Sequence, residues 1–127
     1  MSKCRRAVLF GEPEECREAM EIISALPWFA GQKLEFRHTS SRDELFDHLL
    51  EWRPALAVIL ANGANGMEGV YAVKKHLPNI PVFWFSDDHE FGMQSHRLEC
   101  AYFAVKPLTE EKARRAFQRC AHVGLEF

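Results

Sequence analysis

The stretch RPALAVILANGANGMEG, from Arg53 to Gly69, decides the fold. A short apolar run entered through Pro54 is typical of a buried strand, and a loop rich in glycine and asparagine follows it before a helical pattern begins. In an open parallel sheet, ligands bind at the loop after a central strand. A site is therefore expected between Leu60 and Gly66, yet that loop has no acid, histidine, cysteine or hydroxyl.

The composition predicts a single soluble globular domain over residues 1–127. The chain is 47% hydrophobic and 27% charged, which are ordinary values. Its 16 basic and 18 acidic side chains create no field that favours nucleic acid or an anionic membrane. No apolar run approaches the roughly 20 residues that span a bilayer, and the basic start reaches Gly11 too soon for a signal peptide. We therefore expect a cytoplasmic protein.

The cysteines are expected to be reduced and packed as small apolar residues. None of the four belongs to a CxxC pair, and Cys120 and His122 would point to different faces of a helix. The remaining three are Cys4, Cys16 and Cys100. No metal site is predicted.

Apolar periodicity predicts five strands alternating with five helices. The strands are expected at residues 6–10, 33–38, 55–61, 80–85 and 101–105. The helices are expected to run from Pro13 to before Pro27, from Ser41 to before Pro54, from Met67 to Leu77, from Glu90 to Glu99, and onward from a cap at Thr109. Such alternation favours βαβ units and a parallel sheet with helices on both faces.

Several helices carry an apolar stripe that is predicted to face the sheet. The capping box Ser41-Arg42-Asp43-Glu44 opens a helix with four apolar residues on the expected inner face. These are Leu45, Phe46, Leu49 and Leu50. In the next helix the inward residues are Val70, Val73 and Leu77, and in the last helix they are Ala113, Ala116, Phe117 and Cys120.

The order of these parts resembles the receiver domain of bacterial two-component response regulators over nearly the whole chain. Pro54 with its strand and Met67-Glu68-Gly69 look like the receiver's third strand and its Met-Asp-Gly turn. Ile80–Ser86 is similar to the fourth strand with its terminal hydroxyl, and Ala101–Pro107 to the fifth, with its aromatic Phe103, its lysine and a cis-prolyl bond at Pro107. The segment from Glu90 through LTEEKARRAF most resembles receivers attached to LytTR-type DNA-binding domains. The resemblance implies a flavodoxin-like, doubly wound (βα)5 fold with strand order 2-1-3-4-5.

A working receiver of this family holds five groups at the carboxyl ends of its strands. Two acids after the first strand bind Mg²⁺, an aspartate at the end of the third accepts the phosphoryl group, and a hydroxyl and a lysine follow the fourth and fifth. A hard cation prefers carboxylate oxygens, and the charge of the acyl phosphate is shared among metal, hydroxyl and ammonium.

Only part of that set is present here. Ser86 and Lys106 match, and Gly11-Glu12 keeps one acid of two. No aspartate occurs from Arg53 to Gly69. The position of the acceptor falls on Leu60, Ala61 or Asn62. The resemblance therefore implies a receiver-like cleft without a phosphoacceptor.

Each matching residue also has a purely structural interpretation. Lys106 could pair with Glu12 or Asp87, Ser86 could cap the next segment, and Phe103 could belong to the core. Asp87 and Asp88 fit a solvated helix start. The stretch from Asn62 to Gly66 fits a flexible turn, or a backbone cradle for a small anion.

The leading hypothesis is a pseudo-receiver that signals through protein contacts, with a sensor kinase or an output domain as partner. It is not expected to be an enzyme or to need a cofactor. DNA would be bound only through a separate output domain, absent or removed here. Two alternatives remain: a phosphorylatable receiver that uses Glu68 or Asp87, and a flavodoxin-like protein that binds a small cofactor. The acidic loop GEPEEC disfavours the last, because it repels a flavin phosphate.

Charged stripes near the last strand suggest a weak homodimer. Lys112, Arg115 and Arg119 recur on the last helix, while Asp88, Glu90 and Glu99 precede the last strand. A two-fold axis over this edge would bring acids onto bases. Alternatively, both stripes are simply solvated faces. Because exposed ion pairs contribute only about 0–1 kcal/mol each, the expected dimer is weak and sensitive to salt.

Overall fold

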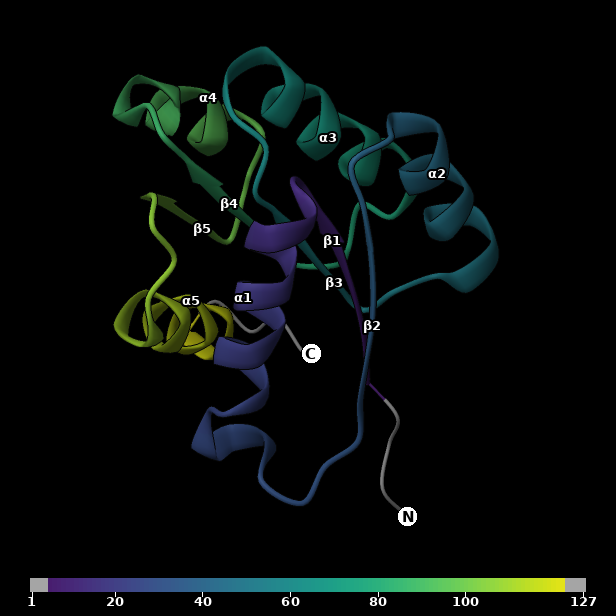
Figure 1. Ribbon diagram of the computed structural model, residues 1–127. Coiled ribbons are helices and arrows are strands. Elements are labelled where there is room, and N and C mark those ends of the chain that lie inside the picture. The colour runs from purple at the N-terminus through teal and green to yellow at the C-terminus, as the bar shows by residue number, and fades with distance from the viewer. Residues whose placement is uncertain (1–4, 123–127) are drawn as a thin grey trace.

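Five parallel strands form the sheet, in the order β2-β1-β3-β4-β5 (Figure 1). The structure is a computed structural model that describes residues 5–122. The strands are β1 (Arg5–Phe10), β2 (Leu34–Thr39), β3 (Leu56–Ile59), β4 (Val82–Ser86) and β5 (Tyr102–Val105). All four pairings are parallel. The predicted sheet and strand order are confirmed.

Helices cover both faces of this sheet (Figure 1). On one face lie α1 (Pro13–Ser24) and α5 (Glu110–His122), and on the other lie α2 (Arg42–Asp47), α3 (Gly63–His76) and α4 (Gly92–Arg97). Three short helical turns lie between these elements. They are the 3-10 turns η1 (Pro27–Phe29) and η3 (His89–Phe91) and the π-turn η2 (His48–Trp52). Within residues 5–122, no helix has the length and apolar character that crossing a membrane requires.

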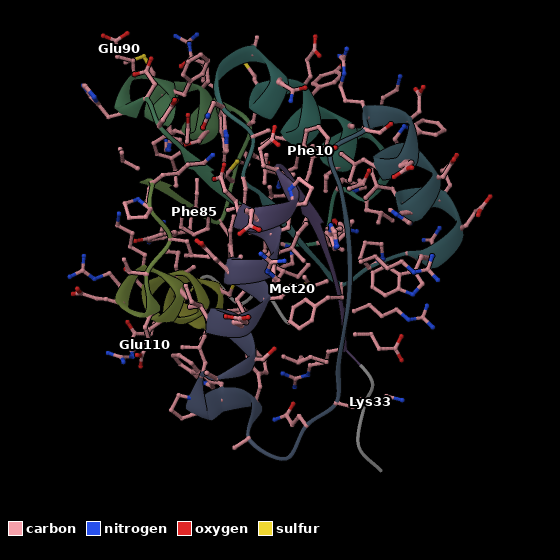
Figure 2. All side chains as sticks on the ribbon, viewed as in Figure 1. Phe10, Met20, Lys33, Phe85, Glu90 and Glu110 are labelled. Carbon is pink, nitrogen blue, oxygen red and sulfur yellow. The ribbon has the colours of Figure 1, made fainter. Side chains whose placement is uncertain are left out.

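The alternation of side chains along the central strands creates two apolar cores. In β3, Leu56 and Val58 face α1 and α5, whereas Ala57 and Ile59 face α2 and α3. All four are 0% exposed. Phe10 belongs to the core beneath α2 and α3, and Phe85 to the core beneath α1 and α5. Figure 2 shows both rings inside the protein, whereas Glu90 and Glu110 lie at its periphery.

The second helix differs from its prediction. Leu45 and Leu49 are buried as expected, but Phe46 and Leu50 are 41% and 47% exposed. The chain passes from α2 into the π-turn η2, and Trp52 takes the next inward position at 7% exposure. Phe46 and Leu50 follow inward residues by one position, which turns them by roughly 100° around the axis.

The third helix begins at Gly63, four residues before the predicted start at Met67. The predicted turn between Asn62 and Gly66 is therefore mostly helix, and its interpretation as a flexible loop is wrong. Asn62 is the extended N-cap, and its carbonyl accepts from the backbone N–H of Gly66. Val70, Val73 and Leu77 face inward as predicted.

Three cysteines of the described chain, Cys16, Cys100 and Cys120, are free and at least partly buried. Burial raises the pKa of the Cys16 and Cys100 thiols to about 12 each and that of Cys120 to about 11. These thiols are therefore neutral and act as small apolar groups. Cys4 lies outside the described residues.

We expect Gly66→Ala to destabilise the protein by roughly 1–3 kcal/mol, because overpacked sites cost about that much. A Cβ at Gly66 would lie 2.6 Å from the indole nitrogen of Trp84 and closer still to the carbonyl of Ala61. Urea unfolding monitored by circular dichroism measures the change.

The matched control is Gly92→Ala, at the first residue of α4. There a Cβ would lie 3.5 Å from the ring of Phe103, an ordinary contact, and the backbone is already helical. Its stability should stay within about 1 kcal/mol of wild type, on the stabilising side. Equal losses in both variants would contradict the packing argument.

Candidate functional site

The carboxyl ends of the strands enclose a small polar cavity of about 250 Å³. Its lining includes six of the seven residues predicted for the receiver-like cleft: Gly11, Glu12, Leu60, Ala61, Asn62 and Lys106. Three further residues line it that sequence reasoning did not select, Glu15, Ser40 and Asn65. Ser86, the seventh, is fully buried beside it.

Lys106 pairs with Glu15, whose carboxylate oxygen lies 2.6 Å from the ammonium nitrogen. The Lys106 side chain is only 15% exposed, so the ammonium is largely withdrawn from water, whereas the Glu15 side chain is 37% exposed. The predicted partners, Glu12 and Asp87, were wrong. Glu12 is the extended N-cap of α1 and is exposed, whereas Glu15 lies in the first turn of the helix. The helical start at Pro13 therefore selects which carboxylate reaches the lysine.

Gly11 and Leu60 are closely packed where β1 and β3 end. A Cβ at position 11 would lie 2.8 Å from the Cβ of Leu60. Leu60 is 2% exposed and belongs to the core beneath α1 and α5. An acid at position 11 thus does not fit while Leu60 keeps its place.

A buried tryptophan fixes the end of β3. The indole Nε1–H of Trp84 donates to the carbonyl oxygen of Ala61 at 3.1 Å. Next to it, the side-chain oxygen of Asn62 accepts from the backbone N–H of Asp87 at 3.0 Å. The sequence analysis missed Trp84, although a tryptophan in a buried strand requires a hydrogen-bond acceptor, and that requirement was a usable signal.

The side chains of Ser86 and Phe103 both make contacts within the protein. The hydroxyl of Ser86 accepts from the backbone N–H of Asp88 at 3.3 Å. The ring of Phe103 meets Trp84 edge to face, with centroids 5.4 Å apart, and lies against Gly92. The Lys106–Pro107 peptide bond is cis.

The cleft offers few ligands for a cation. Glu12 and Glu15 supply its carboxylates, and Glu15 is already paired with the ammonium of Lys106. Mg²⁺ prefers several oxygen ligands, and an adjacent positive charge opposes it. In the described part of the chain, no group of three or more His, Cys, Asp or Glu side chains could hold a metal ion.

Three of the six residues of the predicted dimer edge, Lys112, Arg115 and Asp88, have side-chain partners within the chain. The ammonium of Lys112 donates to the carbonyls of Val105 and Pro107 at 2.5 and 3.0 Å. Arg115 pairs with Glu111 of its own helix at 2.7 Å. On the acidic side, Asp88 accepts from the backbone N–H of Glu90, Glu99 is an exposed residue with φ of 58°, and Arg119 is exposed on α5.

The fold of this chain is similar to that of several solved structures. No family model and no curated protein matches the chain. Among solved structures, the signal receiver domain of an HD domain-containing protein from Pseudomonas fluorescens Pf-5 gives a TM-score of 0.74 at 14% identity, covering 98% of this chain and 100% of that one. A CheY-like response regulator from Mesorhizobium loti gives 0.67 at 19% identity, covering 91% and 98%. A CpaE2 pilus assembly protein from Sinorhizobium meliloti gives 0.71 at 18% identity, with the same coverage of 91% and 98%.

The fold is therefore that of response regulator receiver domains, a flavodoxin-like arrangement in the same strand order. At these identities the similarity concerns the fold, and residue roles must be argued from this chain's own geometry.

Replacing Glu15 with glutamine should destabilise the protein by about 1 kcal/mol, because a mostly buried ammonium loses its charged partner. The same change at Glu12, which also lines the cavity, should stay within about 0.5 kcal/mol of wild type. Chemical denaturation of both variants provides the comparison. A larger loss at Glu12 would mean that the pairing in solution is different.

Proposed function

We propose that this domain is a receiver-like signalling domain that acts through protein contacts and does not accept a phosphoryl group. The observation that carries the proposal is the end of β3. Leu60 is packed into the core, the carbonyl of Ala61 is bound by Trp84, and Asn62 is bound to the backbone of Asp87. None of these three residues offers a carboxylate to a phosphodonor.

The state of the lysine supports the same proposal. In phosphoryl-transfer sites a lysine stabilises the charge of the transferred group. Here the ammonium of Lys106 is neutralised by Glu15 across the cleft. A phosphoryl group would have to displace that carboxylate, and its own charge would then face both Glu12 and Glu15.

Neither substitute acid is well placed for phosphorylation. Glu68 pairs with Arg42 on the α2–α3 side and lines a different hollow of the surface. Asp87 is exposed, follows β4, and does not line the cavity. We infer that the partner is a protein, either a sensor kinase or an output domain, and that any DNA binding belongs to a separate domain of LytTR or another type.

A phosphodonor assay tests this proposal. Incubated with acetyl phosphate and Mg²⁺, the protein should keep its intact mass, because no carboxylate lies at the end of β3. Electrospray mass spectrometry measures the result. A gain of one phosphoryl group that hydroxylamine removes would overturn the proposal, since it identifies an acyl phosphate.

Metal binding gives an independent test. The unmodified domain should not bind Mg²⁺ at sub-millimolar concentration in a calorimetric titration, because Glu15, the second carboxylate of the cleft, is already paired with Lys106, whose positive charge opposes a cation.

The variant Gly11→Asp with Ala61→Asp should gain measurable Mg²⁺ affinity. Because a Cβ at position 11 would lie 2.8 Å from the Cβ of Leu60, we add Leu60→Gly, which removes that atom. Circular dichroism verifies that this triple variant is folded, and Leu60→Gly alone is its control. Tight Mg²⁺ binding by the wild type would contradict our account of the cleft.

A further inference from the structure

Large apolar side chains are exposed mainly on one face of the protein, which α2, α3 and α4 form together (Figure 1). Of the six such side chains in the described chain, four lie on these helices or on η2. They are Phe46, Leu50, Tyr71 and Met93, at 41%, 47%, 60% and 66% exposure. Two of them, Phe46 and Tyr71, line one hollow, and contiguous exposed apolar surface is typical of interaction sites.

The same face contains a groove of about 690 Å³. Its apolar lining is Phe46 of α2, Met67, Tyr71 and Ala72 of α3, and Leu98, the C-cap of α4. The groove is also lined by Gln94, whose side-chain oxygen is buried without a hydrogen-bond partner.

The charges on the outward face of α3 are complementary to those of a second copy of the helix that runs in the opposite direction. Exposed residues recur at Ala64, Glu68, Tyr71 and Lys75, a helical spacing of four, three and four. An acid thus precedes the tyrosine and a base follows it. Two parallel copies of α3 would place like charges together, whereas two antiparallel copies would place each Glu68 opposite the partner's Lys75.

Size also favours the antiparallel arrangement. A two-fold axis between Tyr71 and Ala72 sets each tyrosine over the partner's alanine, a large side chain over a small one. Tyr71 is the most exposed aromatic residue among those described, and Ala72 lines the groove beside Phe46 and Met67.

We propose that the face of α2, α3 and α4 is the interface of a homodimer, in which α3 packs antiparallel against α3 of a second copy. The arrangement is isologous, since each copy contributes the same patch. Its biological meaning rests on the proposed function, namely signalling through protein contacts. It uses a different surface from the edge dimer suggested by the sequence, and Glu68, which contacts Arg42 in the monomer, would contact the partner's Lys75 as well.

Charge exchange across the interface tests the proposal by sedimentation equilibrium over a range of protein concentrations. Glu68→Lys and Lys75→Glu should each weaken self-association about tenfold, because each variant alone places like charges in contact. Mixed in equal amounts, the two variants should associate as well as wild type, since every opposed pair is then Glu with Lys. The double variant should also recover. Tyr71→Ser should weaken association without any change of charge.

Further measurements distinguish loss of the α3 interface from other causes of weaker association. Arg17→Ala breaks an exposed ion pair with Glu14 on α1, on the opposite face of the sheet, and should leave association unchanged. Arg115→Glu tests the edge dimer and should have no effect. Circular dichroism verifies the fold of each variant, and Tyr71→Ser serves if a charge variant fails to fold.

A wild type that stays monomeric at millimolar concentration would overturn the inference. So would a dimer that is indifferent to Glu68→Lys and Tyr71→Ser, or a mixture that fails to recover. The phosphodonor assay is read out by mass and does not depend on association. A failed dimer therefore leaves the proposed function standing, and a phosphorylated protein could still dimerise through α3.

Discussion

One buried hydrogen bond organises the end of the sheet where a site was expected. Trp84 is fully buried in β4, so its indole N–H must find an acceptor inside the protein. It takes the carbonyl of Ala61 just after β3, which leaves no room for a side chain at Gly66. The first turn of α3 therefore packs here without strain only when this residue is glycine. Phe91 and Phe103 pack edge-on around the same indole.

The cleft beside this bond is held together by interactions that compete with phosphoryl chemistry. Leu60 fills the space in front of Gly11, and Glu15 neutralises Lys106. A receiver of the resembled family needs the opposite arrangement, with free carboxylates, a bound cation and an available ammonium. The residues that remain from that set serve here to connect β5 to α1 and β4 to its own following turn.

The sequence predicted the strands, their parallel order and most inward faces, because burial on both sides of a parallel sheet produces apolar runs and helical stripes that are visible locally. Three features could not be read in this way. The first is the π-turn η2, which follows α2 and goes with the exposure of Phe46 and Leu50. The second is the early start of α3, whose first turn packs Gly66 against Trp84. The third is the pairing of Lys106 with Glu15 and not with Glu12, which depends on how α1 is placed. Each depends on packing between segments far apart in the chain, which local pattern does not contain.

The position of Trp84 has an optical consequence. The protein has three tryptophans, of which Trp28 is 44% exposed and Trp52 lies beneath the guanidinium groups of Arg6 and Arg37. Trp84 alone is enclosed by β3, η3 and β5, through Ala61, Phe91 and Phe103. A change in the segment between β4 and β5 would therefore alter the surroundings of one indole and leave the other two as internal references. The chain carries its own fluorescent reporter for this segment, so such changes can be followed without a label.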